Sequence, residues 1–224
     1  MKKFAIAIDG PAGSGKSTVA KILAKKLGIV YIDTGAMYRT VALSCIRKSI
    51  DTKSSGDVVS SLENLNIDIV TENGTQRIFL DGEDVTGKIR TQEVGQGASD
   101  VGLILEVRNK LADMQRQMAK ETSVIMDGRD IGTNVLKDAE VKIYLNASVD
   151  ERAKRRCGEL EQIGCPLPFD KVKEQIIERD RNDMSRKHNP LMKADDAVEI
   201  DSTYMSVEDV ACEIIEIVNK KIGR

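Results

Sequence analysis

Tryptophan is absent from this 224-residue chain, aromatic residues make up 3% of it, and its formal net charge is −2. Scarce aromatic rings leave little surface on which the bases of single-stranded nucleic acid can stack. Binders of nucleic acid or of anionic membranes usually carry a basic surplus, which this composition lacks. We therefore expect no nucleic-acid partner and no membrane partner, and any positively charged site must be local.

Cysteine is also sparse. The four cysteines include no C-x-x-C pair, so the pattern favours neither a disulfide scaffold nor a structural zinc site. No apolar run is long enough to span a bilayer, and the run at residues 4–8 ends at Asp9 instead of extending as a secretion signal does. These features predict a cytoplasmic protein. The length and the 41% apolar content predict a single domain over residues 1–224, with insertions rather than a second domain.

A glycine-rich stretch at residues 10–17, GPAGSGKS, fits the phosphate-loop pattern G-x-x-x-x-G-K-[ST] at every fixed position. It follows an apolar run typical of a strand and precedes apolar residues at helical spacing in residues 19–27. Glycines let the backbone wrap an anion, Lys16 adds a positive charge for the β- and γ-phosphates, and the Ser17 hydroxyl suits Mg²⁺. A glycine-rich turn that binds nothing is the alternative, which the flanking strand and helix disfavour. We predict that ATP is bound by Gly10, Pro11, Ala12, Gly13, Ser14, Gly15, Lys16, Ser17 and Thr18.

A carboxylate follows the second predicted strand, residues 29–32. Asp33 is placed either to hold Mg²⁺-bound water beside the phosphate loop or to cap the helix predicted from residue 35 to about residue 47. The sequence favours neither role over the other. Arg39 lies about one helical turn beyond Thr34, so the two side chains either face one anion or Arg39 points to solvent.

Strands and helices alternate along most of the chain, which predicts a parallel sheet. Further strands are expected at residues 123–126, 141–145 and 198–200, and helices at residues 91–120, with a break near Gly102, and 207–218. Residues 62–90 differ, because apolar and polar residues alternate around two glycine turns; we predict a small antiparallel insertion covering the substrate side. Charged segments on both sides of a loop with one glycine and two prolines predict a helical hairpin at residues 152–187, which would close as a lid.

A site is suggested where the third strand ends, by Asp127, Arg129 and Asp130. Arg129, together with arginines of other segments, suggests a second anion site there. Arginine grips phosphate with two hydrogen bonds and stays charged, which suits an acceptor that is itself a phosphate. Such an acceptor is already ionised, so no general base is needed, and lone His188 is assigned no role. The pattern predicts a nucleoside-monophosphate kinase. Arginines on other segments that can reach the same sheet edge are Arg39, Arg179 and Arg186.

The sequence argues against a GTP-dependent switch and leaves two alternatives open. A GTP-dependent switch needs Asn-Lys-x-Asp after a strand, but Ala112 stands where the aspartate is required and the segment is helical. A kinase for another small acceptor (UMP, AMP or shikimate) and a non-enzymatic ATP-dependent switch remain as alternatives. A panel of acceptors distinguishes them.

Several strings together resemble bacterial cytidylate kinases: IDGPAGSGKST at residues 8–18, DTGAMYR at 33–39, IRTQEV at 89–94, DGRDIGT at 127–133, and PL at 190–191 followed by IDST at 200–203. The resemblance spans nearly the whole chain. It implies a three-layer α/β phosphate-loop kinase with a five-stranded parallel sheet, the small β insertion on the monophosphate-binding side, and a helical lid. It also implies transfer of the γ-phosphoryl group of ATP to CMP or dCMP with Mg²⁺, in pyrimidine nucleotide metabolism, and suggests a monomer.

The resemblance further implies roles for single residues. Cytosine would be read by Ser99, Arg108 and Asp130, and the sugar hydroxyls contacted by Arg179 and Asp183. The lid would bring two arginines to the ATP phosphates, Arg152 and Arg156. The monophosphate would be surrounded by Thr34, Tyr38, Arg39, Arg129 and Arg186. We predict catalytic roles for Lys16, Arg129 and Arg186, and metal-side roles for Ser17 and Asp33.

Overall fold

The computed structural model of the protein describes residues 3–72, 75–162 and 164–223. The chain divides into two compact units, one of residues 1–28 with 125–224 and the other of residues 29–124. The main sheet has five strands in the order β2-β6-β1-β7-β8. The predicted fold class, an α/β fold with a five-stranded parallel sheet and a small antiparallel sheet, is confirmed. The single domain over residues 1–224 stays a prediction.

The first unit is built around buried parallel strands. β1 (Ala5–Asp9) pairs in parallel with β7 (Val141–Asn146), which pairs in parallel with β8 (Val198–Asp201). The same unit contains most of β6 (Val124–Gly128). Ile8 lies opposite Ile143 in the register, and both side chains are buried. Nearly continuous apolar strands of this kind need cover on both faces.

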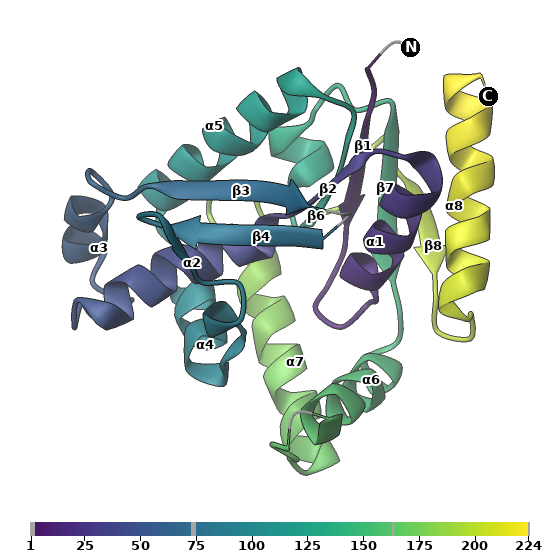
Figure 1. The fold of residues 1–224 in the computed structure, drawn as a ribbon. Coiled ribbons are helices and arrows are strands. Elements are labelled where there is room, and N and C mark those ends of the chain that lie inside the picture. The colour runs from purple at the N-terminus through teal and green to yellow at the C-terminus, as the bar shows by residue number, and fades with distance from the viewer. Residues whose placement is uncertain (1–2, 73–74, 163, 224) are drawn as a thin grey trace. The chain divides into compact units, whose positions relative to one another are not determined.

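Two helices of the first unit pack against each other, α1 (Lys16–Leu27) and α8 (Val207–Ile222) (Figure 1). α1 begins directly after Gly15 and ends directly before Gly28, and both glycines have the left-handed conformation that glycine adopts without strain. α8 begins with a capping box, in which Ser206 and Asp209 satisfy each other's backbone amides. Because α1 starts at Lys16, the phosphate loop connects β1 directly to a helix N-terminus.

A helical hairpin follows β7, formed by α6 (Val149–Gln162) and α7 (Phe169–Met184), shown in green in Figure 1. Its two helices share a small apolar core of Ala153, Leu160, Val172 and Ile176. The two helices lie where a helical hairpin was expected, while a lid with the bounds 152–187 stays a prediction. A π-helical turn, η2 (Ile131–Val135), joins β6 to the loop before β7 and was not predicted.

The second unit contains β2 (Val30–Asp33), α2 (Thr34–Arg47), α3 (Ser55–Ser61), the 3₁₀ turn η1 (Lys88–Arg90), α4 (Gln92–Val101) and α5 (Leu105–Glu121). Its apolar core joins these elements and includes Met37, Val41, Val94, Val107 and Leu111. The predicted interruption near Gly102 is confirmed, because α4 ends one residue before it and α5 begins three residues after it.

The insertion is an antiparallel sheet of β3 (Ile67–Glu72), β4 (Thr75–Leu80) and β5 (Glu83–Asp84) (Figure 1). Ile67, Ile78 and Leu80 point into the core of the second unit. Asp81 and Gly82 turn the chain between β4 and β5, both with positive φ. The predicted small antiparallel sheet is therefore confirmed, while an insertion with the bounds 62–90 and its position relative to a substrate stay predictions.

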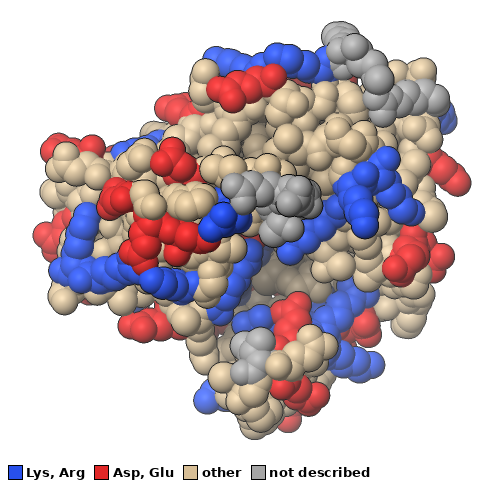
Figure 2. Space-filling view, viewed as in Figure 1, with Lys and Arg blue, Asp and Glu red and all other residues tan. Residues whose placement is uncertain are grey.

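Charges of both signs are intermixed on the face of the molecule shown in Figure 2. This pattern agrees with the near balance of 34 Lys and Arg against 36 Asp and Glu. In the part of the chain that the structure describes, no helix is long and apolar enough to cross a membrane.

Candidate active site

The phosphate loop between β1 and α1 requires glycine at its first position. Gly10 has φ 148°, and a Cβ there would lie 2.0 Å from the carbonyl oxygen of Leu145 on β7. Gly13 and Gly15 also have positive φ, 75° and 90°. The backbone therefore curls tightly over the end of the sheet, in a conformation that other residues adopt only with strain.

The carbonyl oxygens of the loop are held by side chains. The Pro11 oxygen accepts from Lys16 Nζ at 2.5 Å and from Ser14 Oγ at 3.1 Å. The Ala12 oxygen accepts from Arg152 Nη1 at 3.0 Å. The Ser14 oxygen accepts from Ser202 Oγ at 3.3 Å. These contacts come from α1, α6 and the segment after β8, so side chains from three parts of the first unit support the shape of the loop.

Lys16 is buried among charged side chains of both signs. Burial, followed by repulsion from Arg129, lowers the pKa of Lys16 well below its usual value, and Arg179 acts in the same direction. Asp127 and Asp9 oppose this shift. Several cations held close together in a buried place are stabilised by an anion, so this region has the electrostatics of a phosphate site.

The Asp127 carboxylate, which was not among the predicted metal-side residues, lies next to the Ser17 hydroxyl. Ser17 Oγ donates to Asp127 Oδ2 at 2.7 Å, joining the start of α1 to the end of β6. Hydroxyl and carboxylate oxygens are the ligands that Mg²⁺ prefers. Within the described residues, no group of three or more His, Cys, Asp or Glu side chains is arranged to hold a metal. A metal at Ser17 and Asp127 would therefore depend on oxygens from the nucleotide and from water.

Two of the predicted phosphate-binding arginines are held by one aspartate. Arg129 Nε donates to Asp183 Oδ2 at 2.7 Å, and Arg186 Nη2 donates to Asp183 Oδ1. The Asp183 side chain is 4% exposed. Burial raises the pKa of Asp183, but the attraction of Arg129, Arg186 and Arg179 outweighs it and lowers the pKa below the usual value. Asp183 on α7 thus brings together Arg129, which follows β6, and Arg186, which follows α7.

The two predicted lid arginines differ in their surroundings. Arg152 is buried and donates to Asp180 Oδ2 at 2.6 Å, besides its bond to the phosphate loop. Arg156 lies at the surface and pairs with Glu159 at 2.8 Å. Arg155, which was not predicted, donates to the Ser14 and Ser202 oxygens at 3.4 and 2.7 Å. Arg152 and Arg155 therefore fasten α6 to the phosphate loop.

Asp130 follows Arg129 in the segment after β6, and its side chain is buried. Its Oδ2 accepts from Asn134 Nδ2 at 2.9 Å, within the η2 turn. A buried carboxylate that is held by a neighbouring amide is placed to accept a further hydrogen bond in a fixed direction.

In the second unit, Asp33 caps α2. Its Oδ1 accepts from the Ala36 amide at 2.9 Å and its Oδ2 from Arg90 Nη2 at 2.9 Å, which confirms the capping alternative. Its backbone amide donates to Gln76 of β4 at 2.8 Å, so the insertion is tied to the start of α2. A role of Asp33 at a metal stays a prediction.

The other predicted residues of the second unit lie on three helices. Thr34, Tyr38 and Arg39 are on the first turns of α2, with Thr34 buried. Ser99 is on α4, and Arg108 is buried on α5 with Nη1 donating to the Gly102 oxygen at 3.2 Å. The α4–α5 break therefore positions the Arg108 guanidinium. These assignments remain predictions.

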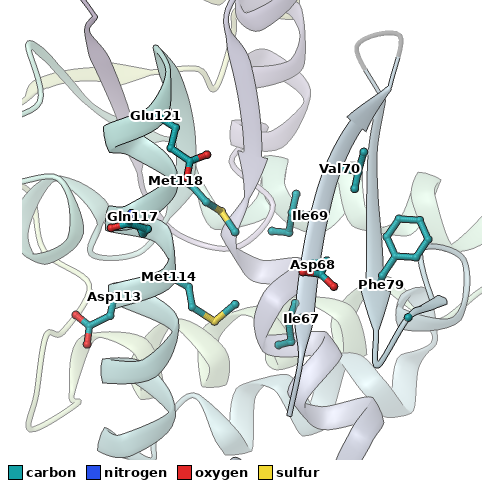
Figure 3. Close-up of a pocket in the computed structure, with 11 residues that line it drawn as sticks. Ile67, Asp68, Ile69, Val70, Phe79, Asp113, Met114, Gln117, Met118 and Glu121 are labelled. Atoms are coloured by element: carbon teal, nitrogen blue, oxygen red, sulfur yellow. The ribbon is translucent and has the colours of Figure 1, made fainter. Parts of the chain in front are cut away.

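A separate hollow of about 850 Å³ lies within the second unit, between the insertion and α5 (Figure 3). Met114 and Met118 of α5 point toward Ile67 and Ile69 of β3 across it. No predicted site residue lines this hollow in the described part of the chain, so it is distinct from the arginine and phosphate-loop region.

Sequence comparisons agree on one family. A family model for cytidylate kinase matches residues 6–220. A protein named cytidylate kinase from Caldicellulosiruptor bescii is 50% identical over 222 residues, covering 99% of this chain and 98% of that protein. Another of the same name, from a Geobacillus species, is 48% identical over 218 residues, with 97% of each chain covered.

Solved structures share the fold. An uncharacterized protein from Eubacterium ventriosum aligns with a TM-score of 0.53 at 15% identity, over 98% of this chain and 99% of that one. A shikimate kinase from Bacteroides thetaiotaomicron aligns with a TM-score of 0.50 at 14% identity, over 96% and 98% of the chains. At such low identity the likeness shows the fold alone.

Proposed function

The chain belongs to the cytidylate kinase family, and we propose that it transfers the γ-phosphoryl group of ATP to CMP or dCMP, giving ADP with CDP or dCDP. The observation that carries the proposal is the group of cations around the phosphate loop. Lys16 is close enough to Arg129 and Arg179 for them to lower its pKa. The phosphate loop and its lysine are sufficient to bind the triphosphate of ATP. The additional arginines suit the phosphate of a nucleoside monophosphate bound beside it.

The acceptor oxygen of a nucleoside monophosphate is ionised near neutral pH, so the chain needs no general base. Lys16 would bind the transferring phosphate, and Arg129 and Arg186 would align the acceptor phosphate and reduce the repulsion between the two anions. Asp183 supports this role, because it holds both arginines at once. An arginine held in this way needs little reorganisation when charge develops in the transition state.

Mg²⁺ fits the oxygen groups at the start of α1. Ser17 and Asp127 would hold it, Asp127 through water or directly, and Asp33 remains a second candidate for water-mediated contact. When bound, Mg²⁺ would neutralise charge on the phosphate oxygens.

Cytosine would be read by Ser99, Arg108 and Asp130, and the sugar hydroxyls by Arg179 and Asp183. Thr34, Tyr38 and Arg39 would complete the monophosphate site. The hairpin of α6 and α7 would exclude water as a lid, with Arg156 free to reach ATP if its exposed pair with Glu159 opens. Arg152 would act through the loop backbone that it already contacts.

We further propose that the protein works as a monomer in the cytoplasm, in pyrimidine nucleotide metabolism. All four cysteines are free thiols, as is usual in a reducing compartment.

The first test is ADP release from MgATP with CMP, dCMP, UMP, AMP or shikimate as acceptor, with an acceptor-free control. Strong turnover confined to CMP and dCMP is expected. Turnover with another acceptor would keep phosphoryl transfer and reject the cytosine assignments. ADP release that is independent of acceptor, or absent, would reject the kinase proposal.

Base selectivity is tested with Asp130→Ala. Loss of an acceptor for the exocyclic amino group should reduce the preference for CMP over UMP by about tenfold or more. Asp138→Ala, at an exposed position after the same turn, serves as the control and should keep the wild-type ratio. An unaltered CMP/UMP ratio in Asp130→Ala would remove Asp130 from base recognition.

A further inference from the structure

We propose that Asp9 is a positioning residue, which fixes the segment carrying Arg129 and Asp130 against the phosphate loop. This inference rests on the proposed function, because it assigns a cause to the placement of two proposed substrate-binding side chains.

Asp9 is the last residue of β1 and directly precedes Gly10, the glycine that fits under the Leu145 carbonyl. Its side chain is buried, and both carboxylate oxygens are engaged. Oδ1 accepts from the Ile131 amide at 2.8 Å, and Oδ2 accepts from the Gly132 amide at 2.7 Å. Two bonds to successive amides fix the orientation of the segment as well as its position.

The bound amides are the first two of the η2 turn, immediately after Asp130. The turn is also closely packed. A Cβ on Gly132 would lie 3.2 Å from Lys142 Cδ and 3.4 Å from Asp9 Oδ2. A bulkier residue at position 132 would push the turn away from the carboxylate.

The distance along the chain from these amides to the proposed substrate groups is short. Asp130 is adjacent to Ile131, and Arg129 is one residue further back. Because consecutive Cα atoms are a fixed distance apart, a displacement of the Ile131 backbone also displaces the backbone of Asp130 and Arg129. Arg129 also bonds to Asp183 on α7, which fixes its other end. Asp9 therefore sets where the Arg129 guanidinium and the Asp130 carboxylate lie relative to the phosphate loop.

No substrate contact is assigned to Asp9. The side chain points at backbone amides, and its effect on the reaction is indirect. A displacement of about 1 Å in aligned reactants reduces turnover on the order of a hundredfold. Loss of one of the two bonds should therefore reduce kcat more than the binding of ATP.

The test compares Asp9→Asn with Asp9→Glu in the full chain. Asparagine keeps the shape but replaces one acceptor with a donor facing an amide. Glutamate keeps both acceptors and adds one methylene, which moves the segment. Glu140→Gln is the matched control, since Glu140 Oε2 accepts from the Ala5 amide, at 2.9 Å, at the opposite end of the same strand.

Both Asp9 variants should lose about tenfold to a hundredfold in kcat for CMP, with less than about a threefold change in KM for ATP. Hydrogen exchange should accelerate in a peptide spanning residues 129–134 and stay unchanged in β8 and α8. The Glu140→Gln control should match the wild type in both measurements.

Two results would overturn the proposal. One is a wild-type kcat together with wild-type hydrogen exchange at residues 129–134 in Asp9→Glu. The other is unchanged hydrogen exchange at residues 129–134 in Asp9→Asn. Faster exchange throughout the chain would assign Asp9 a general structural role instead and would also overturn it. If wild-type protein shows no CMP-dependent turnover, the proposed function fails, while the exchange measurement still decides whether Asp9 positions the segment.

Discussion

The two units of the molecule use charge differently. In the first unit, Arg152 is 4% exposed and its partner Asp180 is 10% exposed. In the second unit, Arg47 and Glu83 form an ion pair with side chains that are 36% and 44% exposed. A buried pair is expensive to assemble and very costly to break, whereas an exposed pair contributes little. The first unit retains its buried charges beside the phosphate loop, where an anion would compensate them.

The same difference between exposed and buried charge is seen when the pKa of one carboxylate from each unit is compared. The pKa of Glu83 is lowered to about 2 by hydrogen bonds from Arg47 and Lys88. The pKa of Asp9 is raised to about 6, chiefly by burial. Glu83 lies in solvent that screens its partners, so its low pKa carries little consequence for folding. Asp9 is held out of water, so its charge bears directly on stability.

The largest effect is expected for Arg129→Ala. Removal of a guanidinium that aligns the acceptor should reduce kcat/KM for CMP about a thousandfold, or about 4 kcal/mol of transition-state stabilisation. Steady-state kinetics with CMP as the varied substrate gives the value. Arg116→Ala removes an exposed arginine of the second unit that pairs with Asp113 and should leave turnover unchanged. Equal kinetics for Arg129→Ala and wild type would reject the role of Arg129.

Breaking the buried pair should destabilise the fold. Arg152→Met leaves Asp180 with an unpaired charge and should lower the free energy of unfolding by about 3–5 kcal/mol in urea denaturation. Asp180→Leu added to Arg152→Met should recover much of the loss, because the remaining charge is removed as well. A double variant as unstable as Arg152→Met alone would show that the unpaired carboxylate is not the cause.

The buried charge of Asp9 predicts a pH dependence. Burial raises the pKa of Asp9 from 3.8 in the free side chain to about 6 in the folded protein, and the charge of Asp130 adds to this shift. The amides of the η2 turn and Lys16 oppose it. The Asp9 charge in turn helps to raise the pKa of Tyr144 on β7. The folded state therefore binds the proton more tightly than the unfolded chain. Ionisation should cost stability on the order of 3 kcal/mol above pH 6, and this cost should disappear as the pH falls from 6 to 4.

Urea denaturation between pH 4 and pH 8 measures this effect. The difference in unfolding free energy between wild type and Asp9→Asn should move in favour of the wild type as the pH falls through 6. Parallel curves, or a difference of the opposite sign, would contradict the raised pKa.

The smallest effect is expected for the exposed pair. Arg47→Ala should shift the thermal midpoint by no more than about 2 °C, and high salt should reduce even that shift. Calorimetry at low and high salt provides the measurement. If Arg47→Ala lowered the thermal midpoint as much as Arg152→Met does in the same calorimetric measurement, the exposed and buried ion pairs would not differ in their contribution to stability.

Local patterns predicted much of the fold. The phosphate loop, the interruption near Gly102 and the antiparallel insertion each depend on signals within a few residues, such as glycine, helical spacing or alternation. The η2 turn carries no comparable signal, because its conformation depends on the Asp9 carboxylate, 122 residues from Ile131.

The connections within the candidate site were harder to predict. Ser17 and Asp127 are 110 residues apart, and Arg129 and Asp183 are 54 apart. The sequence marks each as a candidate charged or polar group at a strand end or on a helix, but pairing depends on the three-dimensional arrangement. Arg155 was missed for the same reason, since its bonds to the backbone oxygens of Ser14 and Ser202 leave no trace in the sequence.

Phosphoryl transfer at the phosphate loop is tested most directly by the product balance with MgATP and CMP, measured by ³¹P NMR for wild type and for Lys16→Met. Coupled transfer predicts one CDP for each ADP in the wild type, and loss of both products when the loop cation is removed. ADP formed without CDP, or equal CDP formation by Lys16→Met, would contradict phosphoryl transfer at this loop.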